Sequence, residues 1–133
     1  FSKVKRESLN AKLIIAGAPT NPDYFDELKQ LVNKLSLKSS VVFTGYVSDR
    51  ELACLYSICD VFAMCSPIEG RPLPPLEAQS FGKPVVAFDT PGVRDVVYRG
   101  ILVEQDNHEK FAEAIISLAK SKRGPNKENR GQH

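Results

Sequence analysis

The chain has 133 residues, a length that suits one domain with its own core. Its hydrophobic content of 42% is typical of a globular protein, and no apolar run approaches the roughly 20 residues of a membrane-spanning helix. The three cysteines, Cys54, Cys59 and Cys65, are too few and too irregularly spaced for a disulfide framework or a zinc site. We therefore expect a protein of a reducing compartment with no structural metal.

The net charge is +2 at pH 7, but the positive charge gathers near the end of the chain. From Lys120 onward there are five basic residues and one acidic residue. A basic segment of this kind can bind nucleic acid or an anionic membrane. Its Gly, Pro and Asn content instead favours a solvated, flexible segment. We therefore predict a basic tail over residues 121–133 and no nucleic-acid partner.

The first elements alternate between strand and helix patterns. Residues 12–17 (KLIIAG) form a short apolar run rich in β-branched side chains, which predicts a buried strand. Asn21 followed by Pro22 marks a helix start, and apolar residues at helical spacing predict a helix over 22–37. A second strand is expected over 41–43, just before a glycine.

The alternation continues through the second half of the chain. Ser48 and Glu51 form a capping box that begins the next helix. We expect the core-facing side of that helix to carry Leu52, Leu55, Tyr56 and Cys59. A second capping box, from Asp106 to Glu109, predicts the last helix, with Phe111, Ile115 and Leu118 on its apolar side. Further strands are expected at 60–65, 84–88 and 101–103.

This order of elements defines the predicted fold class. Strands that are apolar on both faces and alternate with helices are typical of a parallel sheet covered by helices on both faces. The fold class is therefore α/β. In such sheets ligands bind beyond the carboxyl ends of the strands. The segments to inspect are 17–19, 45–48, 66–75 and 89–92.

The stretch after the third strand, from Ser66 to Ala78, holds the least ordinary pattern. Two carboxylates, Glu69 and Glu77, lie eight positions apart, separated by a loop rich in Gly and Pro. Pro74 and Pro75 suit the first turn of a helix, where a missing N–H is no loss. Glu77 would then lie near the positive end of that helix, whose free N–H groups could bind a diphosphate.

The same stretch resembles the signature of the retaining GT-B glycosyltransferases, the family called glycosyltransferases group 1. That signature has two glutamates separated by seven residues and then G-x-P-V-V; this chain reads EGRPLPPLEA followed by QSFGKPVVAF. The blocks LIIAGAP, VVFTGYVSDRELACLYSICDVFAMCSP, DTPGVRDVV and GILVEQDN also resemble the family's C-terminal domain, in the same order. The resemblance implies a Rossmann-like, nucleotide-sugar-binding domain over residues 12–120, the C-terminal half of a GT-B fold.

The resemblance also implies roles for particular residues. Glu77 matches the glutamate that holds the ribose hydroxyls, a task that suits a carboxylate because it can accept from two adjacent hydroxyls. Glu69 matches the glutamate that contacts the donor sugar and helps to stabilise positive charge during transfer, and is the catalytic candidate. The other implied substrate-binding positions are Gly70, Arg71 and Leu73 near the sugar and diphosphate, and Tyr46 and Val47 near the base.

Simpler interpretations stand beside these roles. Glu77 could be a helix-terminal charge that favours the dipole by about 0.3–1 kcal/mol. The side chain of Tyr46 receives no role, because an aromatic there is more often packed or half-exposed. Arg71 and Pro72 depart from the family loop, where an aromatic and a glycine are usual. Proline removes one N–H contact, and Arg71 either replaces it by pairing with phosphate or points into solvent.

The resemblance further implies that parts of the family domain are absent. The family's C-terminal domain begins with a strand and helix ahead of the strand at 12–17, and that strand lies in the middle of the sheet. Residues 1–11 are interpreted as the remnant of that helix or as a linker. The N-terminal acceptor domain is missing too, so we expect a fragment or relic that is inactive alone. An incomplete sheet exposes strand edges, which predicts a homodimer.

The resulting hypothesis is the donor-binding part of a retaining glycosyltransferase, which transfers a sugar from a UDP-, GDP- or ADP-sugar to an acceptor hydroxyl. It would need no cofactor or metal and would act in the cytoplasm or peripherally at the cytoplasmic membrane face. The alternatives are a non-catalytic nucleotide-sugar-binding module and a protein-interaction module. A dehydrogenase is disfavoured, because the loop 17–20 (GAPT) lacks the three-glycine fingerprint. Base, sugar, acceptor and pathway are left open.

Overall fold

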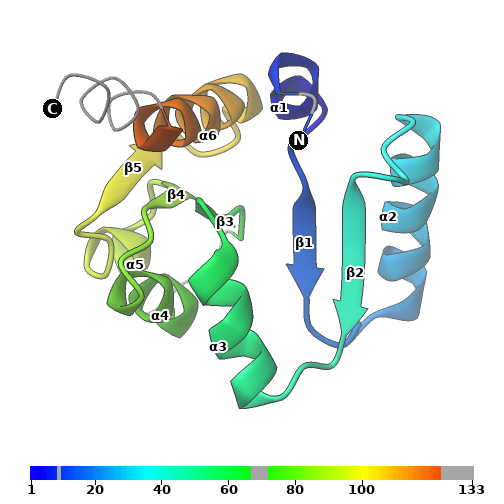
Figure 1. Ribbon diagram of the computed structural model, residues 1–133, viewed down its shortest axis with the longest axis horizontal. Coiled ribbons are helices and arrows are strands. Elements are labelled where there is room, and N and C mark those ends of the chain that lie inside the picture. The colour runs from blue at the N-terminus through cyan, green and yellow to red at the C-terminus, as the bar shows by residue number, and fades with distance from the viewer. Residues whose placement is uncertain (9, 67–71, 124–133) are drawn as a thin grey trace, which may run out of the picture. The chain divides into compact units, whose positions relative to one another are not determined.

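The computed structural model describes residues 1–8, 10–66 and 72–123, in which helices and strands alternate (Figure 1). The elements, in chain order, are α1 (Ser2–Glu7), β1 (Leu13–Ala16), α2 (Pro22–Lys34), β2 (Val41–Gly45), α3 (Asp49–Ile58), β3 (Phe62–Met64), α4 (Leu73–Ser80), β4 (Val85–Phe88), α5 (Pro91–Arg94), β5 (Gly100–Val103) and α6 (His108–Arg123). The expected strands and the longer helices are therefore confirmed.

The chain divides into two compact units, Phe1–Cys54 and Leu55–His133. In the first unit β1 pairs with β2, and in the second β4 lies between β3 and β5. Every strand pair is parallel. The α/β class with parallel sheets is confirmed, although the described strands form two sheets where one was predicted. The predicted boundaries at residues 11 and 120 stay a prediction.

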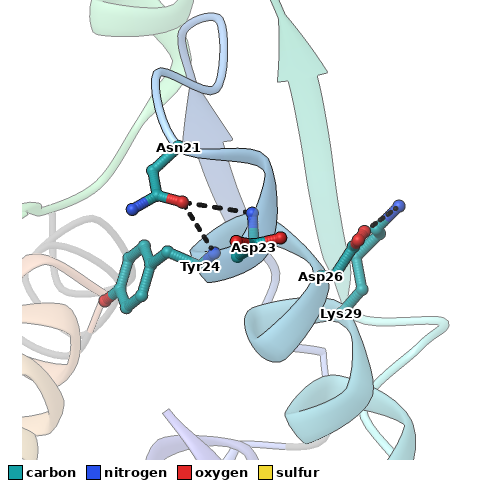
Figure 2. A network of polar contacts seen from close by, with 5 residues as sticks. All are labelled: Asn21, Asp23, Tyr24, Asp26 and Lys29. Carbon is teal, nitrogen blue, oxygen red and sulfur yellow. Dashed lines mark hydrogen bonds and ion pairs between the residues drawn. The ribbon is translucent and has the colours of Figure 1, made fainter.

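In the first unit, α2 begins where the sequence places it. The side-chain oxygen of Asn21 accepts from the backbone N–H groups of Asp23 and Tyr24 at 3.1 and 3.2 Å (Figure 2). Phe25 then packs edge-on against Phe43 of β2, with ring centroids 5.2 Å apart. The helix ends at Lys34, earlier than predicted, because Ser36 adopts a left-handed conformation with φ of 58°.

The core of the second unit is built on β4, which is buried along its whole length. Val86 and Phe88 pack with Val103 of β5 and with Phe111 and Ala114 of α6. Ile115 and Leu118 lie against the same cluster, which confirms the predicted apolar side of α6. A strand buried on both faces is what an uninterrupted apolar run such as PVVAF predicts.

The two predicted capping boxes have different outcomes. The first is confirmed: the Ser48 hydroxyl accepts from the Glu51 N–H at 3.2 Å, and the Ser48 N–H donates to the Glu51 carboxylate at 3.3 Å. The second is wrong by one residue. Asn107 caps α6 by accepting from the Lys110 N–H at 3.0 Å, while Asp106 lies in a left-handed conformation with φ of 66°. That conformation places Asn107 at the cap position.

Gln79 on α4 makes a set of buried hydrogen bonds that no local sequence pattern predicts. Its side chain is 4% exposed. Its amide nitrogen donates to the carbonyls of Pro75 and Val96 at 2.9 and 2.8 Å. Its amide oxygen accepts from the backbone N–H groups of Tyr98 and Arg99 at 2.8 and 2.7 Å. One side chain therefore ties α4 to the segment that leads into β5.

Replacing this amide should destabilise the second unit. Gln79→Met keeps the approximate volume but leaves buried N–H and C=O groups without partners, which should lower the free energy of unfolding by about 2–4 kcal/mol. Gln30→Met, at an exposed position in α2, is the matched control and should change it by less than about 0.5 kcal/mol. Urea unfolding followed by circular dichroism measures both. Equal midpoints for the two variants would contradict the structural role of Gln79.

Candidate functional site

The start of α4 carries the candidate site in the second unit. Pro72 precedes the helix, Leu73 opens it, and Pro74 and Pro75 complete its first turn, as predicted. Glu77 lies just past that turn, and the first turn contains no acidic residue. Because the dipole effect falls off within the first turn, a purely dipolar role for Glu77 is disfavoured.

The same prolines reduce the number of backbone N–H groups that the start of α4 could offer to a diphosphate. A helix normally offers four free backbone N–H groups at its start. In α4 three of those four positions, Pro72, Pro74 and Pro75, carry no N–H group. The one remaining donor is the N–H of Leu73, whose side chain is 65% exposed. The predicted set of several free N–H groups for a diphosphate is therefore reduced to one.

Tyr56, near the end of α3, fixes the Glu77 carboxylate. Its hydroxyl donates to Oε2 of Glu77 at 3.0 Å. The tyrosine side chain is 6% exposed, stacks on Phe81 with centroids 5.5 Å apart, and packs obliquely on Phe62 at 5.8 Å. Burial, and secondly the adjacent Glu77 carboxylate, raise the pKa of Tyr56 well above its ordinary value. The phenol therefore remains a neutral donor.

The remaining predicted site residues divide into two groups. Tyr46 and Val47 follow β2 in the first unit, directly after Gly45, whose φ is 69°. The Tyr46 side chain is 81% exposed, more open than the packed or half-exposed state expected. Glu69, Gly70 and Arg71 lie outside the described residues, so their predicted roles, and the two interpretations of Arg71, stay predictions.

The carboxyl end of β4 adds polar groups for which no sequence pattern predicts a role. The Arg94 guanidinium pairs with the Asp89 carboxylate at 2.5 Å. Next to Asp89, the hydroxyl of Thr90 is buried, and the structure shows no hydrogen-bond partner for it among the described residues. The position of segment 89–92 after a strand predicts a place near a ligand, but nothing in its composition distinguishes these side chains.

An open groove of about 420 Å³ runs along β5 and α6, where Glu104, Lys110 and Glu113 lie beside apolar residues. It contains none of the predicted site residues. Across the described ranges, no cluster of three or more His, Cys, Asp or Glu side chains is arranged to hold a metal ion. None of the helices in those ranges is both long and apolar enough to cross a membrane.

The fold and the paired-glutamate signature define a class, the GT-B glycosyltransferases, whose solved members share this α/β arrangement. The chain belongs to the family "Glycosyl transferases group 1", whose model matches residues 1–132. It is 35% identical over 117 residues to the O-antigen chain mannosyltransferase RfbU of Salmonella typhimurium, covering 87% of this chain and 32% of that protein.

Two further proteins extend the comparison. A GDP-mannose-dependent alpha-(1-6)-phosphatidylinositol monomannoside mannosyltransferase of Mycobacterium tuberculosis is 30% identical over 118 residues, which cover 81% of this chain and 30% of that enzyme. The crystal structure of Anabaena HepE in complex with UDP superimposes with a TM-score of 0.78 at 27% identity, covering 92% of this chain and 35% of HepE. The chain thus spans about a third of the length of each of these proteins.

The pKa of Tyr56 gives a testable pH dependence. In protein labelled with 3-fluorotyrosine, the ¹⁹F resonance of Tyr56 should titrate at higher pH than the free amino acid 3-fluorotyrosine does. Glu77→Gln removes the negative charge and should lower the pKa of Tyr56, although burial keeps that pKa above the ordinary tyrosine value.

The raised pKa also has a consequence for stability. The folded state holds the proton more tightly, so this contribution is complete below the unfolded tyrosine pKa of about 10 and is lost as the pH rises above it. Tyr56→Phe should therefore make the unfolding midpoint less sensitive to pH in that alkaline range. Titration of Tyr56 at the pH of free 3-fluorotyrosine would contradict the arrangement described.

Proposed function

We propose that this chain is the donor-binding part of a retaining glycosyltransferase, with Glu77 as the residue that holds the ribose of a nucleoside diphosphate sugar. The observation that carries the proposal is the Glu77 carboxylate, held at the start of α4 by a buried tyrosine within the family signature. A carboxylate can accept from both ribose hydroxyls, and charge-assisted bonds of this kind are among the stronger ones.

The surroundings of Glu77 support a ligand role over a structural one. Its hydrogen-bond donor comes from a buried neutral phenol, so no basic side chain neutralises the carboxylate through that contact. Glu77 itself is partly exposed and can be reached from solvent. HepE, which is similar to this chain, was crystallised with UDP and also with UDP-glucose. These properties favour a carboxylate that receives hydroxyl groups.

In the whole protein, Glu69 would contact the donor sugar and stabilise the charge that develops as the bond to the diphosphate breaks. Transfer to an acceptor hydroxyl with retention would need an acceptor-binding domain as well. The proposal leaves the base open, because the similar proteins include one that is GDP-mannose-dependent and one that was crystallised with UDP. We further propose a cytoplasmic location, peripheral at the membrane face in the whole protein. Cys54, Cys59 and Cys65 form no disulfide in the structure, which suits a reducing compartment.

A second candidate is a non-catalytic nucleotide-sugar-binding module. It is favoured by the start of α4, where three positions lack an N–H group and only Leu73 offers one. A diphosphate would be held weakly there, whereas the ribose contact at Glu77 would be kept. Binding of nucleosides and nucleoside diphosphates with similar affinity would favour this candidate over a full donor site.

The ribose role is tested by Glu77→Gln in saturation-transfer NMR with UDP-, GDP- and ADP-sugars. We expect transfer to the ribose protons in the wild-type chain and an affinity loss of about 10–100-fold in the variant, as for hydrogen bonds to a charged group worth about 1.5–3 kcal/mol. Glu104→Gln, at an exposed position after β5, is the matched control and should bind as the wild type does. EDTA should leave the affinity unchanged, because we propose no metal or cofactor. Equal binding by both variants would remove Glu77 from the site.

A homodimer is the proposed state of the isolated chain. In the described residues β1, β2, β3 and β5 each pair with a single neighbour, which leaves strand edges for a second copy. Multi-angle light scattering over a concentration series should give a mass near twice the 14.7 kDa of the chain. A constant monomer mass would contradict the dimer. Self-association in a chain that binds no nucleotide would instead support the protein-interaction module.

A further inference from the structure

Tyr56 is held both by contacts of its ring and by a hydrogen bond of its hydroxyl. Its ring packs against two aromatic side chains: Phe81, which it stacks on at an interplanar angle of 23°, and Phe62, tilted at 52°. Phe81 directly follows α4, and Phe62 begins β3. These contacts fix the direction of the phenol, so the position of its hydroxyl is set by the core and not by a flexible side chain.

The hydroxyl has one strong partner. A phenol donates a single hydrogen, and the Oε2 atom of Glu77, at 3.0 Å, is the better acceptor than the carbonyl of Pro74, at 3.5 Å. The structure shows no other hydrogen bond to the Glu77 carboxylate among the described residues. Toward the described residues, Oε1 therefore makes no hydrogen bond, and Oε2 keeps a further lone pair.

We propose that Tyr56 is a positioning residue for the ribose site: its buried hydroxyl holds the Glu77 carboxylate in one rotamer so that both ribose hydroxyls meet a pre-oriented acceptor. The inference rests on the proposed function of Glu77. A glutamate side chain has three rotatable bonds, and immobilising such a side chain on binding costs about 0.5–1.5 kcal/mol. When folding has already ordered the carboxylate, the ligand avoids this cost.

The rival role for Tyr56 is packing alone. The ring, and not the hydroxyl, makes the aromatic contacts, so Tyr56→Phe keeps the packing and removes only the donor. A packing role predicts no effect of this variant on ligands. A positioning role predicts a loss confined to ligands that carry the ribose hydroxyls, because only those use the oriented carboxylate.

The test compares UDP and GDP with their 2′,3′-dideoxy counterparts, by NMR titration of the 133-residue chain. Tyr56→Phe should raise the Kd of the ribonucleotides about three- to tenfold, the fold-change that corresponds to ordering one side chain. It should leave the Kd of the dideoxy compounds unchanged. Tyr98→Phe, at a side chain 72% exposed in the same unit, is the control and should change neither. Thermal unfolding below pH 8 verifies that each variant is folded.

A double-mutant cycle with Glu77→Gln separates the two hypotheses. If Tyr56 acts through Glu77, Tyr56→Phe should have no further effect in the Glu77→Gln background. Loss of binding in Glu77→Gln with wild-type affinity in Tyr56→Phe would overturn the positioning role and keep the proposed function. Wild-type binding by Glu77→Gln, or no nucleotide binding by the folded wild-type chain, would overturn the proposed function itself. Equal losses for ribose and dideoxy compounds in Tyr56→Phe would show an effect that does not depend on the ribose hydroxyls and would also overturn the inference.

Discussion

The burial of β4 on both faces is the constraint on which the second unit depends. Val85, Val86 and Ala87 are 0% exposed and Phe88 is 3% exposed, so the strand contributes no surface of its own. Its neighbours must approach closely: a Cβ at Gly100 would lie 1.9 Å from the carbonyl oxygen of Val85, so only glycine can begin β5 in this register. With β3 and β5 fixed on either side, the helices that cover the sheet have little freedom of position.

That rigidity reaches the candidate site through α4. Gln79 anchors the helix to the segment before β5 with three hydrogen bonds, and Ala78 is 0% exposed beside it. Glu77 directly precedes Ala78 in the same helix, so the contacts of Ala78 and Gln79 also hold the Glu77 backbone in place. Tyr56 of α3 donates a hydrogen bond to the Glu77 carboxylate and so orients the Glu77 side chain. A partly exposed carboxylate thus rests on a core-fixed backbone and a core-fixed donor, the kind of support that a binding residue needs.

The sequence predicts local features of this structure better than distant ones. Asn21 and Ser48 are recognised because a cap depends on three or four consecutive residues. Asp106 and Asn107 are both good caps, and the pattern cannot choose between them; the positive φ of Asp106 decides. The partners of Gln79 lie up to 20 positions away, and those of Tyr56 up to 21, so no local period reveals them. The sequence places Tyr56 on the core side of α3, but not its hydroxyl against a carboxylate.

The prolines of α4 have two opposing effects: they position Glu77, and they remove backbone donors for a phosphate. They start the helix at a defined residue, which keeps Glu77 one turn inside it, where the Tyr56 hydroxyl reaches. The same prolines remove the N–H groups with which a helix start would bind phosphate, leaving that of Leu73. A diphosphate at the proposed site would therefore have to be neutralised mainly by groups other than the α4 backbone. A chain that holds the ribose through a carboxylate but leaves the phosphates to other segments would bind nucleotide weakly by itself, and its selectivity would come from hydroxyl recognition and not from charge.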